Sequence, residues 1–475
     1  MSEKDEYIKA LEEELCASIE REEKLAEEDL GLGAFLVRKI KKTRVYKKTI
    51  DEPDSKIGKL ARAPRSFYRL IKNPEVRKNL LQKKTVNNTI LDATEKPYFL
   101  QPWMSDTDRR IEIAKKALDA GKKLALYYVE KPDSSTFRYR CYNTYQATMQ
   151  SKKWQAVYFF KQELSVVEEL LPSSSLLIMG RQSGQEKNVE RLISLAHKNG
   201  IKAGLDIDDL VFDMKYLDLM LDSIGEKANK SYWMSYFGSV QSMAKHMDFF
   251  VTTNKYLSDR IKESYRKPCR EIRNSINDEQ VSASNVYVKR KERDDGKFVM
   301  GYFSGSPTHK KDLDEALPEI VEFLDRHEDA VLEVVGYMKF SKEIEDYVTK
   351  KRIRFVPFVD FRKLQKLMAE VDVNVAPLLV NEFTNCKSEL KFFEAAAVET
   401  VTIASPTYTF KKAISNGENG FLAKPGEWYD KIEFLYDNPE ERQKIAKVAR
   451  EYALEHYHGK EFLKEVEAVY DYFAK

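Results

Sequence analysis

Two lysines and a glutamate in the last quarter of the chain have the spacing of a site for phosphate and sugar groups. Lys387, Lys391 and Glu394 fall at i, i+4 and i+7, and on a helix these positions share one face. Seven residues of helix span roughly 10 Å, so a diphosphate at the Lys387 end leaves Glu394 within reach of a ribose. Residues 371–377 are rich in valine and predict a short strand before this helix. A strand, a loop and a cation-bearing helix together form a common phosphate site of α/β proteins, whereas the simpler alternative is a solvated helix face.

The residues that follow this face carry a resemblance to a known family. They resemble the donor-binding segment of GT-B glycosyltransferases near family 4, which includes bacterial enzymes of cell-surface polysaccharide synthesis. Glu394 matches the glutamate that binds the nucleotide ribose, and Ser405 matches the end of the next strand. Gly417 and Gly420 match the glycine-containing turn. Many family-4 enzymes carry another glutamate eight residues before the ribose-binding one, and this chain has Cys386 at that position. The resemblance therefore does not decide between a retaining and an inverting mechanism.

The resemblance implies a set of donor-binding residues. Residues 303–313 resemble the loop after the first strand of the donor domain, where a glycine lets backbone amides approach a phosphate and cations add charge. Residues 356–360 resemble the loop that contacts the nucleotide base. A plain turn is the alternative for the first loop, and a core position is the alternative for the aromatic residue of the second. The implied donor set is Gly305, Ser306, His309, Lys310, Phe358, Lys387, Ser388, Lys391 and Glu394.

Carboxylates in the first half are candidates for the acceptor side of the reaction. Residues 205–213 resemble a segment of the same bacterial glycosyltransferases, which makes Asp208 and Asp209 the candidate catalytic residues that activate or orient an acceptor hydroxyl. Asp206 and Asp208 also form an Asp-x-Asp pair, which binds a divalent metal in another glycosyltransferase fold. Because the pair lies in the half opposite the donor site, we expect no metal. A structural turn is a further alternative.

Three arginines follow strand ends in the first half. A guanidinium group suits the recognition of phosphate or carboxylate, so these residues are candidate acceptor ligands, with ordinary surface arginines as the alternative. They are Arg138, Arg140 and Arg181.

Composition describes a globular protein of more than one domain. The chain has 475 residues, of which 33% are charged and 12% aromatic, and its net charge is +3. The small net charge gives no indication of a nucleic-acid partner. The four cysteines lie far apart without metal-ligand spacing, the acidic N-terminus is unlike a signal peptide, and no run of about 18 apolar residues occurs. No nucleophile elbow, P-loop, dinucleotide fingerprint or zinc-protease motif is placed convincingly. We expect a cytoplasmic protein.

The N-terminal stretch has two oppositely charged parts. Residues 1–30 form an acidic helix pattern, through which we expect oligomerisation. Residues 38–48 contain seven basic residues and no acidic one, and basic character continues to residue 72. Such a segment suits attachment to an anionic membrane surface, which places the protein at the inner face of the plasma membrane. The alternative is a solvated helix neutralised by the acidic part.

The alternation of predicted strands and helices along the chain predicts the domain organisation. From about residue 108, short apolar runs alternate with helical patterns, which is typical of parallel sheets covered on both faces. We expect an α/β protein with two Rossmann-like domains facing a cleft and an N-terminal helical appendage. The charged stretch 278–296 is interpreted as a linker. The expected divisions are an appendage at 1–95, an acceptor domain at 96–280, a nucleotide-sugar domain at 297–455, and a C-terminal helix at 456–475 that braces the N-terminal domain.

These features together predict a glycosyltransferase. It moves a sugar from a nucleotide-diphosphate sugar to a cell-surface glycan or lipid-linked acceptor, and it needs no cofactor besides that donor. Two rivals remain. A GT-B-like sugar-nucleotide epimerase shares the fold and donor site, and a catalytically inactive glycosyltransferase-like binding partner accounts for the missing second glutamate.

Overall fold

The computed structural model describes residues 107–130, 132, 135–181, 187–224, 229–289, 295–305, 310–336, 338 and 344–475. All of them belong to one compact unit. The acidic and basic segments of the predicted appendage lie outside the described residues. Within the described part, no helix is long and apolar enough to cross a membrane.

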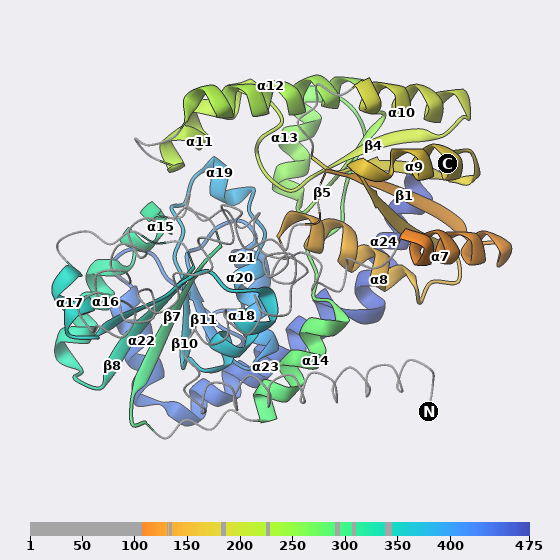
Figure 1. Cartoon of the computed structure of the whole chain (residues 1–475). Helices are drawn as coiled ribbons and strands as arrows, with labels where there is room; N and C mark the ends of the chain where they lie inside the picture. The colour runs from red at the N-terminus through yellow and green to blue at the C-terminus, as the bar shows by residue number, and fades with distance from the viewer. Residues whose placement is uncertain are drawn as a thin grey trace, which may run out of the picture. The chain divides into compact units, whose positions relative to one another are not determined.

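The first half of this unit is built on a six-stranded sheet in the order β2-β1-β3-β4-β5-β6. Figure 1 shows part of this sheet, with β1, β4 and β5 labelled. Every neighbouring pair of strands is parallel. Its strands are continuous apolar runs, as expected where both faces of a parallel sheet are covered. The strands are β1 (Lys123–Val129), β2 (Trp154–Phe160), β3 (Leu176–Met179), β4 (Lys202–Ile207), β5 (Phe249–Thr252) and β6 (Cys269–Glu271).

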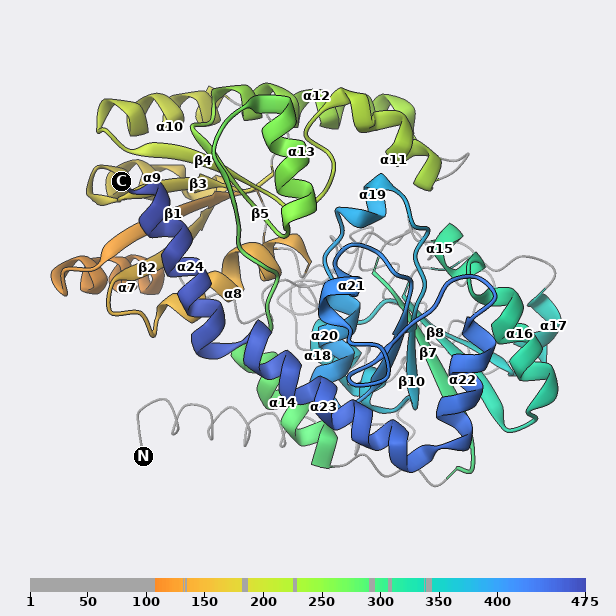
Figure 2. The same cartoon turned by 180° about the vertical axis from the view of Figure 1, so that it is seen from behind.

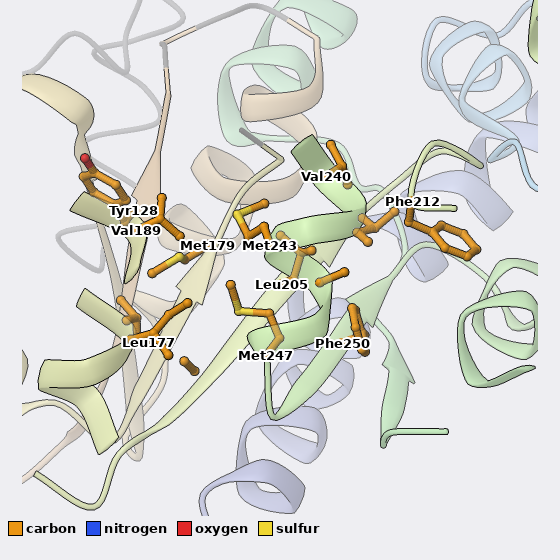
Figure 3. Packing of buried hydrophobic residues seen from close by; sticks show 14 of the residues in the cluster. Tyr128, Leu177, Met179, Val189, Leu205, Phe212, Val240, Met243, Met247 and Phe250 are labelled. Carbon is orange, nitrogen blue, oxygen red and sulfur yellow. The ribbon is translucent and has the colours of Figure 1, made fainter. Parts of the chain in front are cut away.

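Helices pack on both faces of this first sheet. Its helices are α7 (Thr107–Asp119), the π-helical turn η4 (Arg138–Tyr142), α8 (Asn143–Thr148), α9 (Leu164–Leu170), α10 (Lys187–Lys198), α11 (Leu217–Ile224), α12 (Lys230–His246) and α13 (Lys255–Tyr265). Three short 3-10 turns are η5 (Lys161–Glu163), η6 (Leu171–Ser173) and η7 (Met214–Tyr216). Figure 3 shows one side of the core, where Met179 and Leu205 of the strands meet Met243 of α12.

The second half is built on another parallel six-stranded sheet, in the order β12-β11-β10-β7-β8-β9. Its strands are β7 (Phe298–Ser304), β8 (Ala330–Gly336), β9 (Ile353–Val356), β10 (Val373–Ala376), β11 (Val401–Ala404) and β12 (Phe421–Leu422). The two sheets confirm the predicted pair of Rossmann-like domains.

The helices of the second half also lie on both faces of their sheet. Phe323 and Trp428 pack on one side of it, and Phe393 and Phe410 on the other. The helices are α14 (Asp278–Lys289), α15 (Lys310–Asp314), α16 (Leu317–Arg326), α17 (Glu345–Thr349), α18 (Phe361–Ala369), α19 (Glu382–Asn385), α20 (Leu390–Ala397), α21 (Phe410–Ala413), α22 (Trp428–Asp437) and α23 (Pro439–Tyr457).

The chain passes between the two halves twice. It leaves the first sheet after β6, and the last helix, α24 (Gly459–Phe473), packs against the first sheet beside α8 (Figure 2). Tyr470 of α24 shares a hydrogen bond of 2.8 Å with Tyr127 of β1, and Phe473 stacks on Phe249 of β5. The two crossings touch, because the Ile276 amide donates to the Tyr457 carbonyl at 2.8 Å.

Two local expectations are wrong. The stretch interpreted as a linker begins with helix α14. Asn277 caps it by accepting from the Gln280 amide at 2.7 Å. Its buried face mixes polar residues such as Ser284 with apolar ones such as Val286, so no clear apolar period marks it. The expectation that Lys387, Lys391 and Glu394 share one helix face is also wrong. Helix α20 begins at Leu390, and Lys387 lies before it, where its carbonyl accepts from the Thr409 hydroxyl.

Candidate functional site

Lys391 places a buried cation at the carboxyl end of β7. Its side chain leaves α20, its Nζ donates to the Phe303 carbonyl at 2.7 Å, and it lies 4.6 Å from the ring centre of Tyr302. The residue is 8% exposed. Burial lowers the pKa of Lys391 from 10.5 to about 8, with Asp312 opposing the shift and Lys387 adding to it. This ammonium group is thus held next to the loop that begins at Gly305.

Lys387 connects the donor side to the carboxylates of the first half. Its Nζ lies 2.7 Å from Oδ1 of Asp209 and 4.5 Å from the ring centre of Phe383. The same Asp209 lies 3.5 Å from Arg181, which also pairs with Asp208 at 2.8 Å. Four of the predicted residues therefore meet in one cluster of alternating charge.

Glu394 lies in a different set of contacts. It is 2% exposed, and its Oε1 accepts from Nη2 of Arg138 at 3.2 Å and from Nε2 of Gln280 at 2.9 Å. The Tyr139 hydroxyl donates to the same oxygen. Sequence reasoning predicted Arg138 and Glu394 but not that they pair with each other.

Arg140, the remaining candidate arginine of the first half, forms an ion pair with Asp206. Arg140 is buried and pairs with Asp206 through Nε at 2.8 Å and Nη2 at 3.1 Å. Its Nη1 donates to the Ile272 carbonyl and to Asn274. Burial raises the pKa of Asp206, and Arg140 opposes the shift. Arg140 is therefore engaged inside the first half, at the exit of its last strand.

The Asp-x-Asp pair has arginine partners. Asp206 pairs with Arg140, and Asp208 pairs with Arg181 while also accepting from the Thr136 hydroxyl at 3.0 Å. Among the described residues, no group of three or more His, Cys, Asp or Glu side chains is placed to hold a metal ion. The charges of this pair are balanced by guanidinium groups.

The two predicted donor loops are described in part. Gly305 is exposed directly after β7, and a Cβ there would meet open space. Ser306 and His309 lie outside the described residues, as does the side chain of Lys310, whose backbone begins α15. Phe358 is half-buried in the loop between β9 and α18.

Ser388 and Ser405 tie local loops together. Ser388 accepts from Nδ2 of Asn274 at 2.8 Å, which joins the start of α20 to the segment after β6. Ser405 accepts from the Leu378 amide at 2.9 Å and thereby fixes the loop after β10. A small pocket next to this loop is lined by Ser223, Asp312, Leu379, Asn381, Phe383, Thr384 and Lys387.

Sequence reasoning missed Tyr139, Gln280 and Thr136. Tyr139 lies in sequence between Arg138 and Arg140, which were both candidates, and this position between two candidates was a signal that could have identified it. Gln280 lay in the stretch interpreted as a linker, and Thr136 carries no signal beyond its closeness to Arg138.

The comparison with protein families decides the class of the second half. Residues 287–452 match the family described as Glycosyl transferases group 1. We call these residues the group 1 domain, after the family that they resemble. This group 1 domain contains β7 to β12 together with Lys387, Lys391 and Glu394. The match supports a glycosyltransferase activity for this part of the chain.

Solved structures share the arrangement of two sheets. A glycosyltransferase from Rickettsia africae is 12% identical with a TM-score of 0.50, over 74% of this chain and 99% of that one. HepE of Anabaena in complex with UDP is 13% identical, with a TM-score of 0.48 over 74% and 99% of the two chains. TarM of S. aureus is 14% identical, with a TM-score of 0.44 over 66% and 57%. The fold is GT-B. No curated protein matches the chain.

Proposed function

We propose that this glycosyltransferase takes its sugar from a nucleotide-diphosphate sugar and transfers it to a cell-surface glycan or a lipid-linked acceptor. The observation that supports the donor class most is Lys391, a buried ammonium group at the carboxyl end of a parallel strand inside the group 1 domain. Ligands of open parallel sheets bind at the carboxyl ends of the strands.

In this proposal the cations stabilise the leaving group. Negative charge grows on the diphosphate as the bond to the sugar breaks, and a cation already in place lowers the energy of that transition state. Lys391 supplies such a cation, and Lys387 supplies a second from the cluster with Asp209. Glu394 accepts the ribose hydroxyls. The glycine at 305 leaves room for a phosphate beside the backbone.

The carboxylates of the first half act on the acceptor. A donor phosphate competes with Asp209 for the ammonium group of Lys387, since the two groups lie 2.7 Å apart without donor. Binding of donor would thus release Asp209 to accept a hydrogen bond from the acceptor hydroxyl. Asp208 stays with Arg181 and helps to orient it. Arg181 remains the proposed acceptor-side arginine, whereas Arg138 pairs with Glu394.

The first prediction tests the cation at the strand end. In Lys391→Met, transfer or donor hydrolysis falls roughly ten- to a hundred-fold, because a charge-assisted contact contributes about 1.5–3 kcal/mol. The assay uses a panel of UDP-, GDP- and ADP-sugars, with product analysis by mass. Lys363→Met, which removes an exposed lysine of α18, is the control. Equal rates in wild type and Lys391→Met would contradict the donor site.

The same assay separates the rival chemistries. Activity is expected to persist in EDTA, because lysines take the role of a metal in this proposal. Loss in EDTA with recovery in magnesium or manganese would instead favour the Asp206–Asp208 metal site. Conversion of the donor to an isomer without acceptor would favour an epimerase.

A further inference from the structure

The contacts of Glu394 are unequal between its two oxygens. All three hydrogen bonds to the carboxylate end on Oε1, and their donors are Arg138, Tyr139 and Gln280. A carboxylate has room for about four hydrogen bonds, shared between two oxygens. The side chain is therefore anchored by one oxygen, while Oε2 has none of these bonds.

The three donors come from elements other than the helix that carries Glu394. Arg138 and Tyr139 belong to η4, which follows the first strand of the first sheet, and Gln280 belongs to α14. Glu394 lies on α20 of the group 1 domain, more than 250 positions away from Tyr139 in sequence. The orientation of this carboxylate thus depends on two residues of the first half, Arg138 and Tyr139, together with Gln280.

The donors themselves are fixed by packing. Tyr139 is 6% exposed and meets Phe393 edge to face, with 6.4 Å between ring centres. The Arg138 guanidinium lies 4.0 Å from the ring centre of Tyr139 and 4.8 Å from that of Phe361. Gln280 is fully buried, and Asn277 accepts a hydrogen bond from its backbone amide. Such support holds a functional side chain in one orientation.

The charges are consistent with a carboxylate that accepts all three bonds. Burial raises the pKa of Tyr139 well above its usual value, with Arg138 opposing the shift, so its phenol stays protonated and donates. Burial acts to lower the pKa of Arg138, but Tyr139 and Glu394 raise it overall, so the guanidinium stays charged. One charged and two neutral donors therefore converge on a single oxygen.

We propose that Tyr139 and Gln280 are positioning residues that hold Glu394 by Oε1 so that Oε2 accepts the ribose hydroxyls of the donor. This inference rests on the proposed function, since it assumes a nucleotide-diphosphate sugar in the group 1 domain. It makes recognition of the ribose a joint property of the first half of the chain and the group 1 domain. A carboxylate free to rotate would lose part of its preference for a donor with ribose hydroxyls.

The test measures ribose recognition itself. Calorimetry compares UDP, GDP and ADP with their 2′,3′-dideoxy analogues on wild type, Tyr139→Phe and Gln280→Leu, using the base that wild type binds. Wild type is expected to prefer the ribonucleotide by roughly ten- to a hundred-fold, the range of one or two hydrogen bonds to a charged group. In each variant this preference falls at least threefold, and affinity for the dideoxy analogue is unchanged.

A matched control comes from the same turn. The Tyr142 hydroxyl donates to Oε1 of Glu279 at 2.5 Å, so Tyr142→Phe removes a buried phenol from a different carboxylate. Its preference for the ribonucleotide stays at the wild-type value. Melting temperatures confirm that each variant is folded.

The outcomes separate this inference from the proposed function. If Tyr139→Phe lost affinity equally for the ribonucleotide and the dideoxy analogue, Tyr139 would have a structural role only, and the inference would be overturned. The inference would also be overturned if both variants kept the wild-type preference for the ribonucleotide. A wild type that binds ribonucleotide and dideoxy analogue equally removes the ribose role of Glu394 and leaves donor binding intact. A wild type that binds none of the three nucleotides overturns the proposed function itself.

Discussion

Lys391 is a lysine whose burial has a measurable energetic consequence. The ammonium group is enclosed by Tyr302 and the Phe303 carbonyl, and removal from water disfavours its charged form. Its pKa is lowered to about 8, so near neutral pH it is charged and ready to meet an anion. The free protein thus holds a desolvated cation that a diphosphate would complement.

The first prediction at this scale concerns pH and activity. Because the proposed donor contact needs the charged form, kcat/KM for the donor falls as pH rises through about 8. The measurement is a pH profile of kcat/KM from pH 6.5 to 9.5, with Lys363→Met as the control. A profile that stays flat across pH 8 would show that the charge of Lys391 takes no part in donor binding.

The same shift predicts the sign of a stability change. The pKa of Lys391 is lower in the folded chain, so between about pH 8 and 10.5 the unfolded chain binds more protons and folded stability rises with pH. Lys391→Met lacks this gain, and its stability relative to wild type falls by about 2 kcal/mol from pH 7 to 9.5. Urea unfolding at both pH values measures the difference. Lys363→Met is expected to show no such change.

At the scale of elements, the ends of β7 and β8 approach each other closely where the donor loop begins. Gly336 ends β8 with φ of 107°, and a Cβ there would lie 1.9 Å from the Ser304 carbonyl oxygen. A side chain at this position conflicts with both the backbone angle and the neighbouring strand. Gly336 therefore fixes the point from which Gly305 leaves the sheet.

The prediction at this scale compares two glycines. Gly336→Ala is expected to destabilise the fold by at least about 1–3 kcal/mol, because the strained backbone and the clash add together. Gly305→Ala is expected to melt like wild type, since its Cβ meets open space, but to bind donor more weakly. Thermal unfolding and the donor KM provide the two readouts. Similar melting temperatures for both variants would contradict the role of Gly336.

The sequence predicted the strands well and the contacts between distant elements poorly. Continuous apolar runs such as Leu124–Val129 can hardly be anything but buried strands, and β1 lies there. Helix α14 escaped prediction because polar residues interrupt the apolar ones on its buried face and its cap, Asn277, acts through a side chain. Lys391 and Glu394 were predicted from their type and spacing, and both lie on helix α20. Tyr139 was not, because local spacing carries no information on a partner 255 positions away.

At the scale of the whole molecule, the basic stretch 38–48 is the part whose role is argued from sequence alone. We propose that it attaches the protein to an anionic membrane surface, near a lipid-linked acceptor. Each basic residue near such a surface contributes about 1 kcal/mol, so seven of them give attachment that salt weakens.

The corresponding prediction uses the full chain. Wild type is expected to co-sediment with vesicles containing anionic lipid at low salt and to be released as salt rises. Replacement of Lys41, Lys42, Lys47 and Lys48 by glutamine reduces the bound fraction severalfold but leaves donor hydrolysis unchanged. Neutral vesicles are the control. Full-length protein that ignores anionic vesicles at low salt would show that the acidic stretch 1–30, or a partner, neutralises this charge instead.

The return of α24 to the first sheet also has a consequence for synthesis on the ribosome. Five apolar side chains of this helix, Phe462, Val466, Val469, Tyr470 and Phe473, complete a core whose last strand ends at Glu271. About 200 further residues must be translated in between, which takes roughly 10–40 s at common rates. During that time the nascent first domain exposes an unfinished apolar face, the kind of surface that chaperones bind. A chain that stops early, even after a complete group 1 domain, would therefore fail first in its N-terminal half.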